Sequence, residues 1–178
     1  MKIKILNHLE YAGAILKRPT EEIEFPLSEE NNIILDNMIK IMYQAKGIGL
    51  AANQIGYDRR MFVMDTSNEK DSPQIFINPI ITAKNNVKTG DIEGCLSCPG
   101  EKVKVNRSMS VNLKWMCKHG EEQHKTFYYL PGRVVQHEMD HLNGKLIIDK
   151  DFLEEAEKEK EELNESYKES VRQANERK

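Results

Sequence analysis

The sequence predicts an α+β fold in which mostly antiparallel sheets pack around a central helix carrying the letters H-E-x-x-H, with an N-terminal helix and a charged C-terminal helix. Apolar and polar residues alternate between residues 102 and 129, which is the period of half-buried strands. Apolar residues recur at helical spacing over residues 28–46, and a thin apolar stripe runs through the charged segment after residue 150. These two periods predict sheets and helices within one chain.

A length of 178 residues predicts one domain, with residues 1–150 as its body and residues 151–178 as a charged helical extension of it. The extension has 10 acidic and 6 basic residues, a net charge of −4; since the whole chain is −3, the body carries about +1. The body therefore lacks the strong positive charge that is typical of proteins that bind nucleic acid. No apolar run reaches the length of a membrane span and no signal peptide is visible, which predicts a cytoplasmic protein.

Residues 28–46 are predicted to form the N-terminal helix. Ser28 is a suitable N-cap, two glutamates follow it in the first turn, and Gly47 is a suitable stop. We interpret the stripe as core rather than as a ligand site, because its spacing places it on one helix face. Its members are Ile34, Leu35, Met38, Ile41, Met42 and Ala45.

Strands are predicted wherever short apolar or alternating runs are bounded by turn-forming residues. His119-Gly120 is the predicted turn of a hairpin, and Asp151 is a candidate cap for the final helix. The predicted strands cover residues 60–65, 74–78, 102–106, 108–115, 126–129 and 145–149.

The central helix is predicted around Gln136-His137-Glu138-Met139-Asp140-His141-Leu142, with Pro131 at its first position and Gly144 as its stop. On a helix, His137 and His141 share one face and can bind one divalent metal. Glu138 can then reach a water bound to that metal. The alternative is a surface helix that carries two histidines by chance.

The chain has three cysteines, an odd number that favours reduced thiols over a disulfide framework. Cys95-x-x-Cys98 together with the two histidines of the central helix would make a closed Cys2His2 structural zinc site. Residues three apart on a strand point to opposite faces, so both sulfurs reach one metal only if a tight turn bends the chain. We therefore favour Cys95 as the metal ligand and Cys98 as a buried apolar residue.

The run from Gly47 to Gly56 matches the letters G-x-G-x-x-A of a dinucleotide fingerprint. That motif needs a preceding strand and a helix opening from it, whereas here a helix runs into the glycines. The glycines are better suited to a close backbone approach to a ligand, or to positive φ. Gln54 then offers an amide donor nearby.

Three segments stand in order: G-I-G-L-A-A-N-Q at 47–54, E-G-C-L-S at 93–97 and Q-H-E-M-D-H-L at 136–142. Together they resemble the three signature motifs of the peptide deformylase family, and the resemblance covers roughly residues 33–149. It implies that residues 1–150 form a deformylase-like catalytic domain. The implied reaction is hydrolysis of the N-formyl group from the N-terminal formyl-methionine of newly made polypeptides, releasing formate.

The resemblance also implies roles for individual residues. The metal ligands would be Cys95, His137 and His141, and the catalytic groups Glu138, Gln54 and the Leu96 backbone. Three protein ligands leave one open position for water, the mark of a catalytic metal, whose bound water has a lowered pKa. The methionine side chain and substrate backbone would contact Ile48, Gly49, Leu130 and Val134.

One divalent metal ion per chain is expected, with Fe²⁺ suggested by the resemblance and Zn²⁺, Ni²⁺ or Co²⁺ as alternatives. The expected partners are N-formylmethionyl nascent peptides, without specific nucleic acid or membrane binding; a transient ribosome contact through the charged C-terminal helix stays open. Three departures from the family pattern are the N-terminal arm, which lacks the usual Pro-rich opening, Asp91, at an often apolar pocket position, and the pair Pro131-Gly132.

Other functions remain open from sequence alone. A zinc endopeptidase can be built on H-E-x-x-H with a different third ligand. A non-catalytic Cys2His2 structural zinc module, or a deformylase-like binding protein without activity, would use the same histidines.

Overall fold

The protein is described by a computed structural model that covers residues 4–9, 11–149, 152–154 and positions 158, 161, 164, 165, 168, 169, 172 and 173. Its elements in chain order are η1 (Tyr11–Lys17), α1 (Glu29–Gln44), β1 (Gly49–Ala51), η2 (Ala52–Ile55), β2 (Met61–Met64), β3 (Gln74–Lys84), β4 (Lys88–Cys95), β5 (Cys98–Ser108), β6 (Ser110–Met116), β7 (Glu122–Tyr128) and α2 (Tyr129–Leu142).

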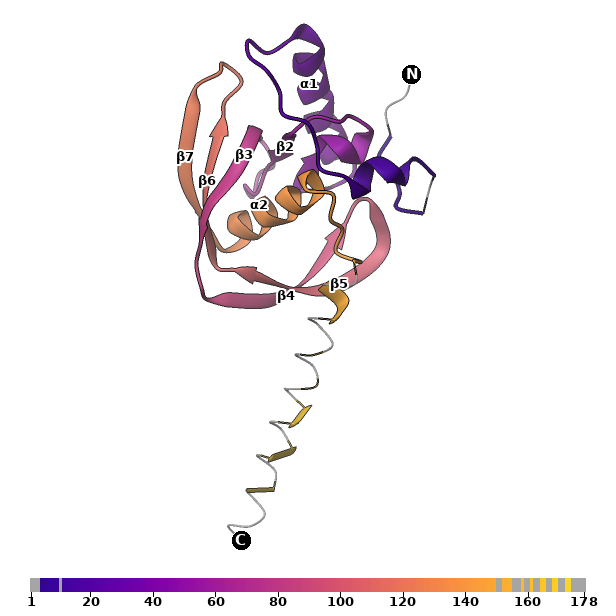
Figure 1. Cartoon of the computed structure of the whole chain (residues 1–178), viewed down its shortest axis with the longest axis vertical. Helices are drawn as coiled ribbons and strands as arrows, with labels where there is room; N and C mark the ends of the chain where they lie inside the picture. Colours follow the sequence, from indigo (N-terminus) through magenta and orange to yellow (C-terminus); the bar gives the residue numbers. More distant parts are fainter. Residues whose placement is uncertain are drawn as a thin grey trace.

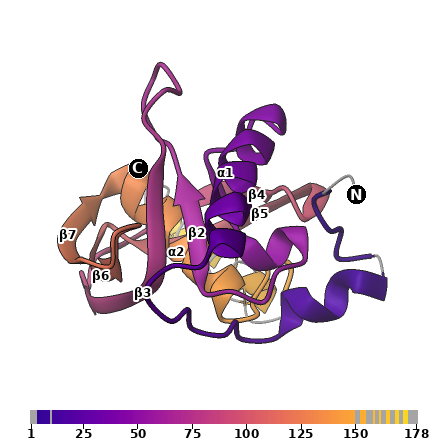
Figure 2. The same ribbon diagram turned by 90° about the horizontal axis from the view of Figure 1, so that it is seen from above.

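Two antiparallel sheets surround α2. Five strands pair in the order β1-β2-β3-β6-β7, while β4 and β5 form a separate two-stranded sheet. Figure 1 shows α2 between the β6–β7 side of the larger sheet and the β4–β5 pair. Figure 2 shows α1 on the far side of β2, away from β6 and β7. The predicted α+β fold with a central H-E-x-x-H helix is confirmed.

Helix α1 begins and packs as its sequence predicts. Ser28 accepts a hydrogen bond from the Asn31 N–H at 3.2 Å, which satisfies one free donor of the first turn. The buried apolar stripe packs against residues of β1 and β2, including Leu50 and Val63. The helix ends slightly earlier than expected, at Gln44, and Lys46 rather than Gly47 takes the left-handed conformation (φ 56°).

Helix α2 is buried because apolar residues flank its polar motif. Val134, Val135, Met139 and Leu142 pack into a core with aromatic side chains of the large sheet. Among these aromatics, the ring of Phe76 stacks on a neighbouring phenylalanine of β2 with centroids 4.4 Å apart. The sheet side chains of this core include Phe62, Met64, Phe76 and Phe127.

The start of α2 differs from the predicted position, whereas its end agrees with the prediction. The helix begins at Tyr129, two residues before the predicted Pro131, which still falls in the first turn where an N–H has no helical partner. Gly144 takes positive φ (74°), and its N–H donates to the His141 carbonyl at 3.0 Å. A Cβ at Gly144 would lie 2.6 Å from the backbone nitrogen of Arg18, so a larger residue would clash there. The predicted helix stop at this glycine is confirmed.

Several predicted strand limits were wrong. β3 continues through Pro79 to Lys84, with a shift in its pairing register between Ile77 and Ile80 that accommodates the proline. Residues 145–149 form turns rather than a strand, held by Leu146 N–H donating to the Asp149 carboxylate. The hairpin turn at Gly120 is confirmed by its positive φ (82°), and the returning strand starts at Glu122.

β4 and β5 are joined by the two-residue turn Leu96-Ser97, so that Cys95 pairs directly with Cys98. Our argument that these cysteines point to opposite faces assumed a continuous strand and was wrong. Directly opposed residues of an antiparallel pair share a face.

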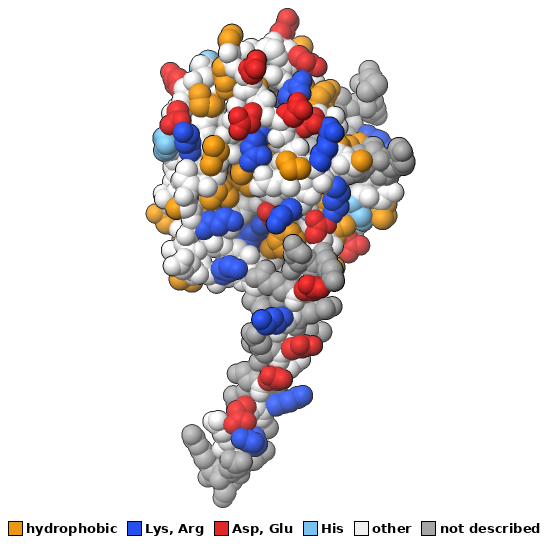
Figure 3. Space-filling view, in the orientation of Figure 1, with side chains coloured by type: hydrophobic (Ala, Val, Ile, Leu, Met, Phe, Trp, Pro, Cys, Tyr) orange, Lys and Arg blue, Asp and Glu red, His pale blue; other side chains and the backbone are white. Residues whose placement is uncertain are grey.

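Beyond residue 151, the described positions are helical, which agrees with the predicted C-terminal helix; the candidate cap Asp151 lies outside the described residues. Both acidic and basic side chains lie on the surface of this segment (Figure 3). In the part of the chain that the structure describes, no helix combines the length and the apolarity that a membrane span needs.

Candidate metal centre

Three side chains with metal-binding atoms converge where α2 faces the end of β4. His137 and His141 stand one turn apart on α2, with ring centroids separated by 4.9 Å. The ligand atoms of Cys95, His137 and His141 all lie within 4.8 Å of one another. The Cys95 Sγ is 3.1 Å from His141 Nε2. The structure thus brings together the three residues that the sequence selects as ligands.

His137 is oriented by a carboxylate on β4. Its Nδ1 lies 3.0 Å from Glu93 Oε2, which leaves Nε2 as the nitrogen that is free for a metal. Burial lowers the pKa of His137, but the hydrogen bond to Glu93 and the negative charges of Glu138 and Glu93 together outweigh burial, and the net pKa is raised. An outer carboxylate of this kind is typical of histidines that bind metals.

Glu93 is itself fixed by two arginines. Arg107 donates to both of its oxygens at 2.8 Å, and Arg133 donates to Oε1 at 2.8 Å. Burial alone would raise the pKa of Glu93, but the hydrogen bonds from Arg107 and His137 hold the pKa well below its usual range. The carboxylate therefore stays ionised, although Glu93 is only 7 % exposed.

The sequence reading did not assign this network. Glu93 stood inside the second motif, and Arg107 and Arg133 were not singled out. The available signal was the spacing of Glu93 and Cys95. Residues two positions apart on a strand point to the same face, so a charged residue at position 93 would lie beside the candidate ligand. Only the packing of β4 and β5 on α2 shows which arginine side chains contact Glu93.

The residues present fit a divalent metal. One thiol and two imidazoles are a common donor set for zinc and other first-row ions. The fit is supported by a buried oxygen, Glu138 Oε2, that has no hydrogen-bond partner among the described residues. His141 is 1 % exposed, and burial keeps its pKa well below the usual value, so that its ring is neutral as a ligand must be.

Glu138 adjoins this centre. It is 3 % exposed, and burial raises the pKa of its carboxyl to about 7. A Cβ added to Gly49 would lie 2.3 Å from Glu138 Oε1, so the backbone of β1 approaches the carboxylate closely. A carboxyl that titrates near neutral pH can both accept and return a proton.

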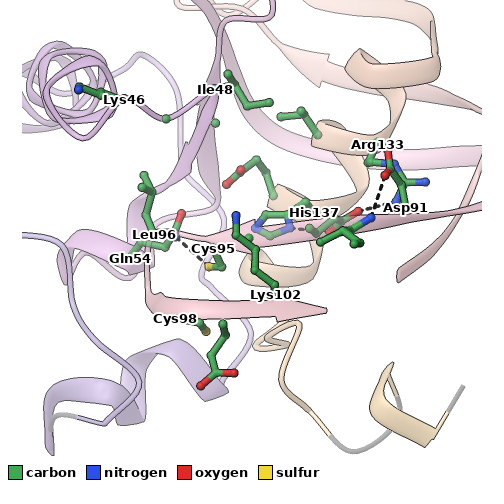
Figure 4. Close-up of a pocket in the computed structure, with 18 of the residues that line it drawn as sticks. Lys46, Ile48, Gln54, Asp91, Cys95, Leu96, Cys98, Lys102, Arg133 and His137 are labelled. Atoms are coloured by element: carbon green, nitrogen blue, oxygen red, sulfur yellow. Dashed lines mark hydrogen bonds and ion pairs between the residues drawn. The ribbon is translucent and has the colours of Figure 1, made fainter. Parts of the chain in front are cut away.

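Gln54 is aimed at the centre from η2. Its Oε1 accepts the Ala51 N–H at 2.8 Å, which fixes the orientation of the amide. Its Nε2 donates to Ser97 Oγ at 3.2 Å and lies 3.7 Å from Cys95 Sγ. The side-chain amide therefore reaches the turn that carries Leu96 and Ser97, as Figure 4 shows.

A cavity of about 480 Å³ opens beside these groups. Asp91 also lines it, together with Arg133, so this part of the wall is charged rather than apolar (Figure 4). His141 is buried and is not among the residues that line the cavity. The sequence-selected residues on the cavity wall are Ile48, Gly49, Gln54, Cys95, Leu96, Leu130, Val134, His137 and Glu138.

Cys98 lies outside the three-donor group of the described residues. It is 1 % exposed and packs with Leu16 and Leu146 in an apolar cluster. This agrees with our preference for a buried apolar Cys98 over a fourth ligand.

Gly49→Ala is expected to lower kcat/KM for a formyl-methionyl peptide by on the order of 10²-fold. The new methyl group would lie 2.3 Å from Glu138 Oε1, so the Glu138 carboxylate would have to move away from its position. Steady-state kinetics on the metal-loaded variant measures this. Gly90→Ala is a matched control on an exposed strand, since its Cβ meets only the flexible ends of Lys104 and Asn106. Equal effects of the two substitutions would contradict the assignment.

Glu93→Gln is expected to weaken metal binding about 10- to 100-fold, since a neutral amide positions His137 less well. It should also cost about 3 kcal/mol of unfolding free energy, because two arginines lose their buried anion. Metal competition and denaturant unfolding measure the two effects. Asp140→Asn removes another partner of Arg107 without touching His137, so unchanged metal affinity is expected there; equal weakening would argue against positioning by Glu93.

Comparison with known proteins agrees with this geometry. The family model described as polypeptide deformylase matches residues 5–159. A peptide deformylase of Xylella fastidiosa (strain M12) is 44% identical over 123 residues, 69% of this chain and 72% of the relative. A peptide deformylase of Aquifex aeolicus is 42% identical over 143 residues, 79% of this chain and 83% of the relative.

Solved structures agree as well. The peptide deformylase of Thermotoga maritima superposes with a TM-score of 0.76 at 34% identity, covering 84% of this chain and 97% of that one. A probable peptide deformylase from Synechococcus phage S-SSM7 gives a TM-score of 0.77 at 35% identity, covering 85% and 99%. The chain therefore belongs to the peptide deformylase family, metal-dependent enzymes that remove the formyl group from nascent polypeptides.

Proposed function

We propose that this chain hydrolyses the N-formyl group of N-terminal formyl-methionine on newly made polypeptides and releases formate. The observation that carries the proposal is the buried Glu138 carboxyl, which lines a cavity of about 480 Å³ together with Cys95 and His137 of the three-donor group. An amide hydrolase needs a group that moves protons at the reacting bond, and this carboxyl lies where a substrate would enter.

Cys95, His137 and His141 would hold one divalent ion. When bound, the ion supplies Lewis-acid polarisation and a lowered pKa for a water molecule. We propose Fe²⁺ as the working ion, on the family resemblance, with Zn²⁺, Ni²⁺ or Co²⁺ able to use the same donors. A thiolate with two imidazoles suits all four, and affinity order alone favours the later metals over iron.

Glu138 is the proposed proton carrier. It takes a proton from the attacking water and delivers it to the leaving amine, so that the formyl C–N bond breaks to give formate and a free N-terminus. Burial supports this role because it raises the pKa of Glu138 to about 7.

Gln54 and the Leu96 N–H are the proposed donors for the oxyanion. Gln54 is suited to this because its Oε1 is already fixed by the Ala51 N–H, and fixed donors need little rearrangement in the transition state. Loss of one such donor typically raises the barrier by about 3 kcal/mol.

The substrate chain is proposed to lie along β1. This strand forms an edge of the five-stranded sheet, so the Gly49 backbone can pair with an extended peptide. Ile48 and Val134 would contact the methionine side chain, with Leu130, which is 51% exposed, at the cavity mouth.

Two wider assignments belong to the same proposal. We place the protein in a cytoplasm with formyl-methionine translation, where the charged C-terminal helix is available for a transient ribosome contact. We also treat residues 151–178 as an extension of the catalytic domain, which the family match to residue 159 supports.

The test is formate release from formyl-Met-Ala-Ser by protein prepared without oxygen and with its metal content measured. We expect stoichiometric formate and free methionyl peptide, and no cleavage of internal bonds. A zinc endopeptidase would instead cut internal peptide bonds and release no formate, which would overturn the proposal.

A further inference from the structure

We propose that Cys95 and Cys98 form a reversible disulfide when a peroxide reaches the site, and that Cys98 thereby protects Cys95 from irreversible oxidation. The crosslink follows from the placement of the two cysteines alone. Its consequence for the metal rests on the proposed function, because it requires Cys95 to be a ligand.

The turn between β4 and β5 places the two cysteines opposite each other. Only Leu96 and Ser97 separate them, and they are register partners of the hairpin. Opposed residues in an antiparallel pair have Cα atoms about 4.5–5.5 Å apart and share a face. Disulfides form at Cα separations of about 4.4–6.8 Å, so the backbone is already at bridging distance.

The side chains occupy one environment. Both cysteines line the cavity, and Cys95 packs against the apolar cluster that contains Cys98, Leu16 and Leu146. The third cysteine, Cys117, follows β6 of the other sheet, and its Sγ lies 3.9 Å from Glu121 Oε2.

Their unequal exposure sets the order of reaction. Cys98 is 1 % exposed whereas Cys95 is half-buried, so a peroxide meets Cys95 first. The Cys95 sulfur attacks one peroxide oxygen, the O–O bond breaks, and the thiol becomes a sulfenic acid while one water leaves. The Cys98 sulfur then attacks Cys95 Sγ, the S–O bond breaks, and a second water leaves.

In sum, two thiols lose two electrons and two protons, and one peroxide becomes two waters. Two equivalents of a small thiol reduce the disulfide by exchange and restore both cysteines. Without Cys98, the sulfenic acid is exposed to further peroxide and proceeds to sulfinic and sulfonic acids, which thiols do not reverse. A disulfide sulfur also lacks the thiolate charge and does not serve as the metal ligand. The three-donor group would then keep only its two imidazoles, and metal binding would weaken.

The experiment treats the full chain, metal-free and zinc-loaded, with hydrogen peroxide. The readouts are the mass of the tryptic peptide of residues 89–102, the count of free thiols, and zinc bound before and after dithiothreitol. For the wild type we expect loss of two hydrogens from this peptide, loss of zinc, and recovery of both on reduction. Cys98→Ala should instead gain oxygen atoms at Cys95 and fail to recover zinc binding.

Cys117→Ser is the matched control and should behave as wild type; Cys98→Val serves if the alanine variant does not fold. Oxygen addition at Cys95 in the wild type, with no crosslink, would overturn the proposal, as would a disulfide to Cys117. A Cys95–Cys98 crosslink that leaves zinc fully bound would support the disulfide and overturn the ligand role of Cys95, so the two failures are distinguishable.

Discussion

Glu138→Gln is expected to lower kcat on a formyl-methionyl peptide by about 10²- to 10⁴-fold while the protein keeps its metal, because an amide cannot accept the proton of the attacking water. Glutamine matches the size of the buried side chain, so packing beside Gly49 and Val134 is kept. Formate release and metal analysis on the same sample measure the two quantities.

The control for this prediction must change a neighbouring carboxylate without changing the proton carrier. Asp140, on the same helix, pairs with Arg107 and does not line the cavity. Asp140→Asn should therefore keep kcat within a few-fold of wild type. Full turnover by Glu138→Gln would rule out its role as general base, whereas loss of metal in that variant would indicate a structural role at the centre.

Cys95→Ala is expected to weaken metal binding by on the order of 10²- to 10³-fold, one ligand's share of the binding free energy of such a site. Cys98→Ala should leave metal content unchanged, because Cys98 packs in an apolar cluster outside the three-donor group. Competition with a chromophoric chelator measures both affinities. If the two variants lose metal equally, the site is the closed Cys2His2 type and the open catalytic centre is wrong.

The sequence predicted most of the helices because a helix is specified locally. The Ser28 cap, the stripe of α1, the Gly144 stop and the i, i+4 spacing of His137 and His141 depend on residues within a few turns of one another. Strand limits were less well predicted. Pro79 did not end β3, since the sheet absorbs it with a register shift, and residues 145–149 form turns despite their apolar composition.

The cysteine pair shows where local reasoning fails. Period-2 geometry put Cys95 and Cys98 on opposite faces, but two intervening residues form a hairpin turn and bring them onto one face. The preference for Cys95 over Cys98 as the ligand agrees with the structure for a different reason: Cys98 is enclosed by apolar side chains, and Cys95 adjoins His141.

The sequence by itself determined the family and the chemical groups of the centre, because three motifs in order specify a thiol, two imidazoles and a carboxyl. Only the tertiary structure decided what surrounds them. The anchoring of His137 by Glu93 and two arginines, and the approach of Gly49 to Glu138, join elements that are far apart in the chain. The physical reason is that spacing within one element is fixed by backbone geometry, whereas contacts between elements depend on register, turns and packing.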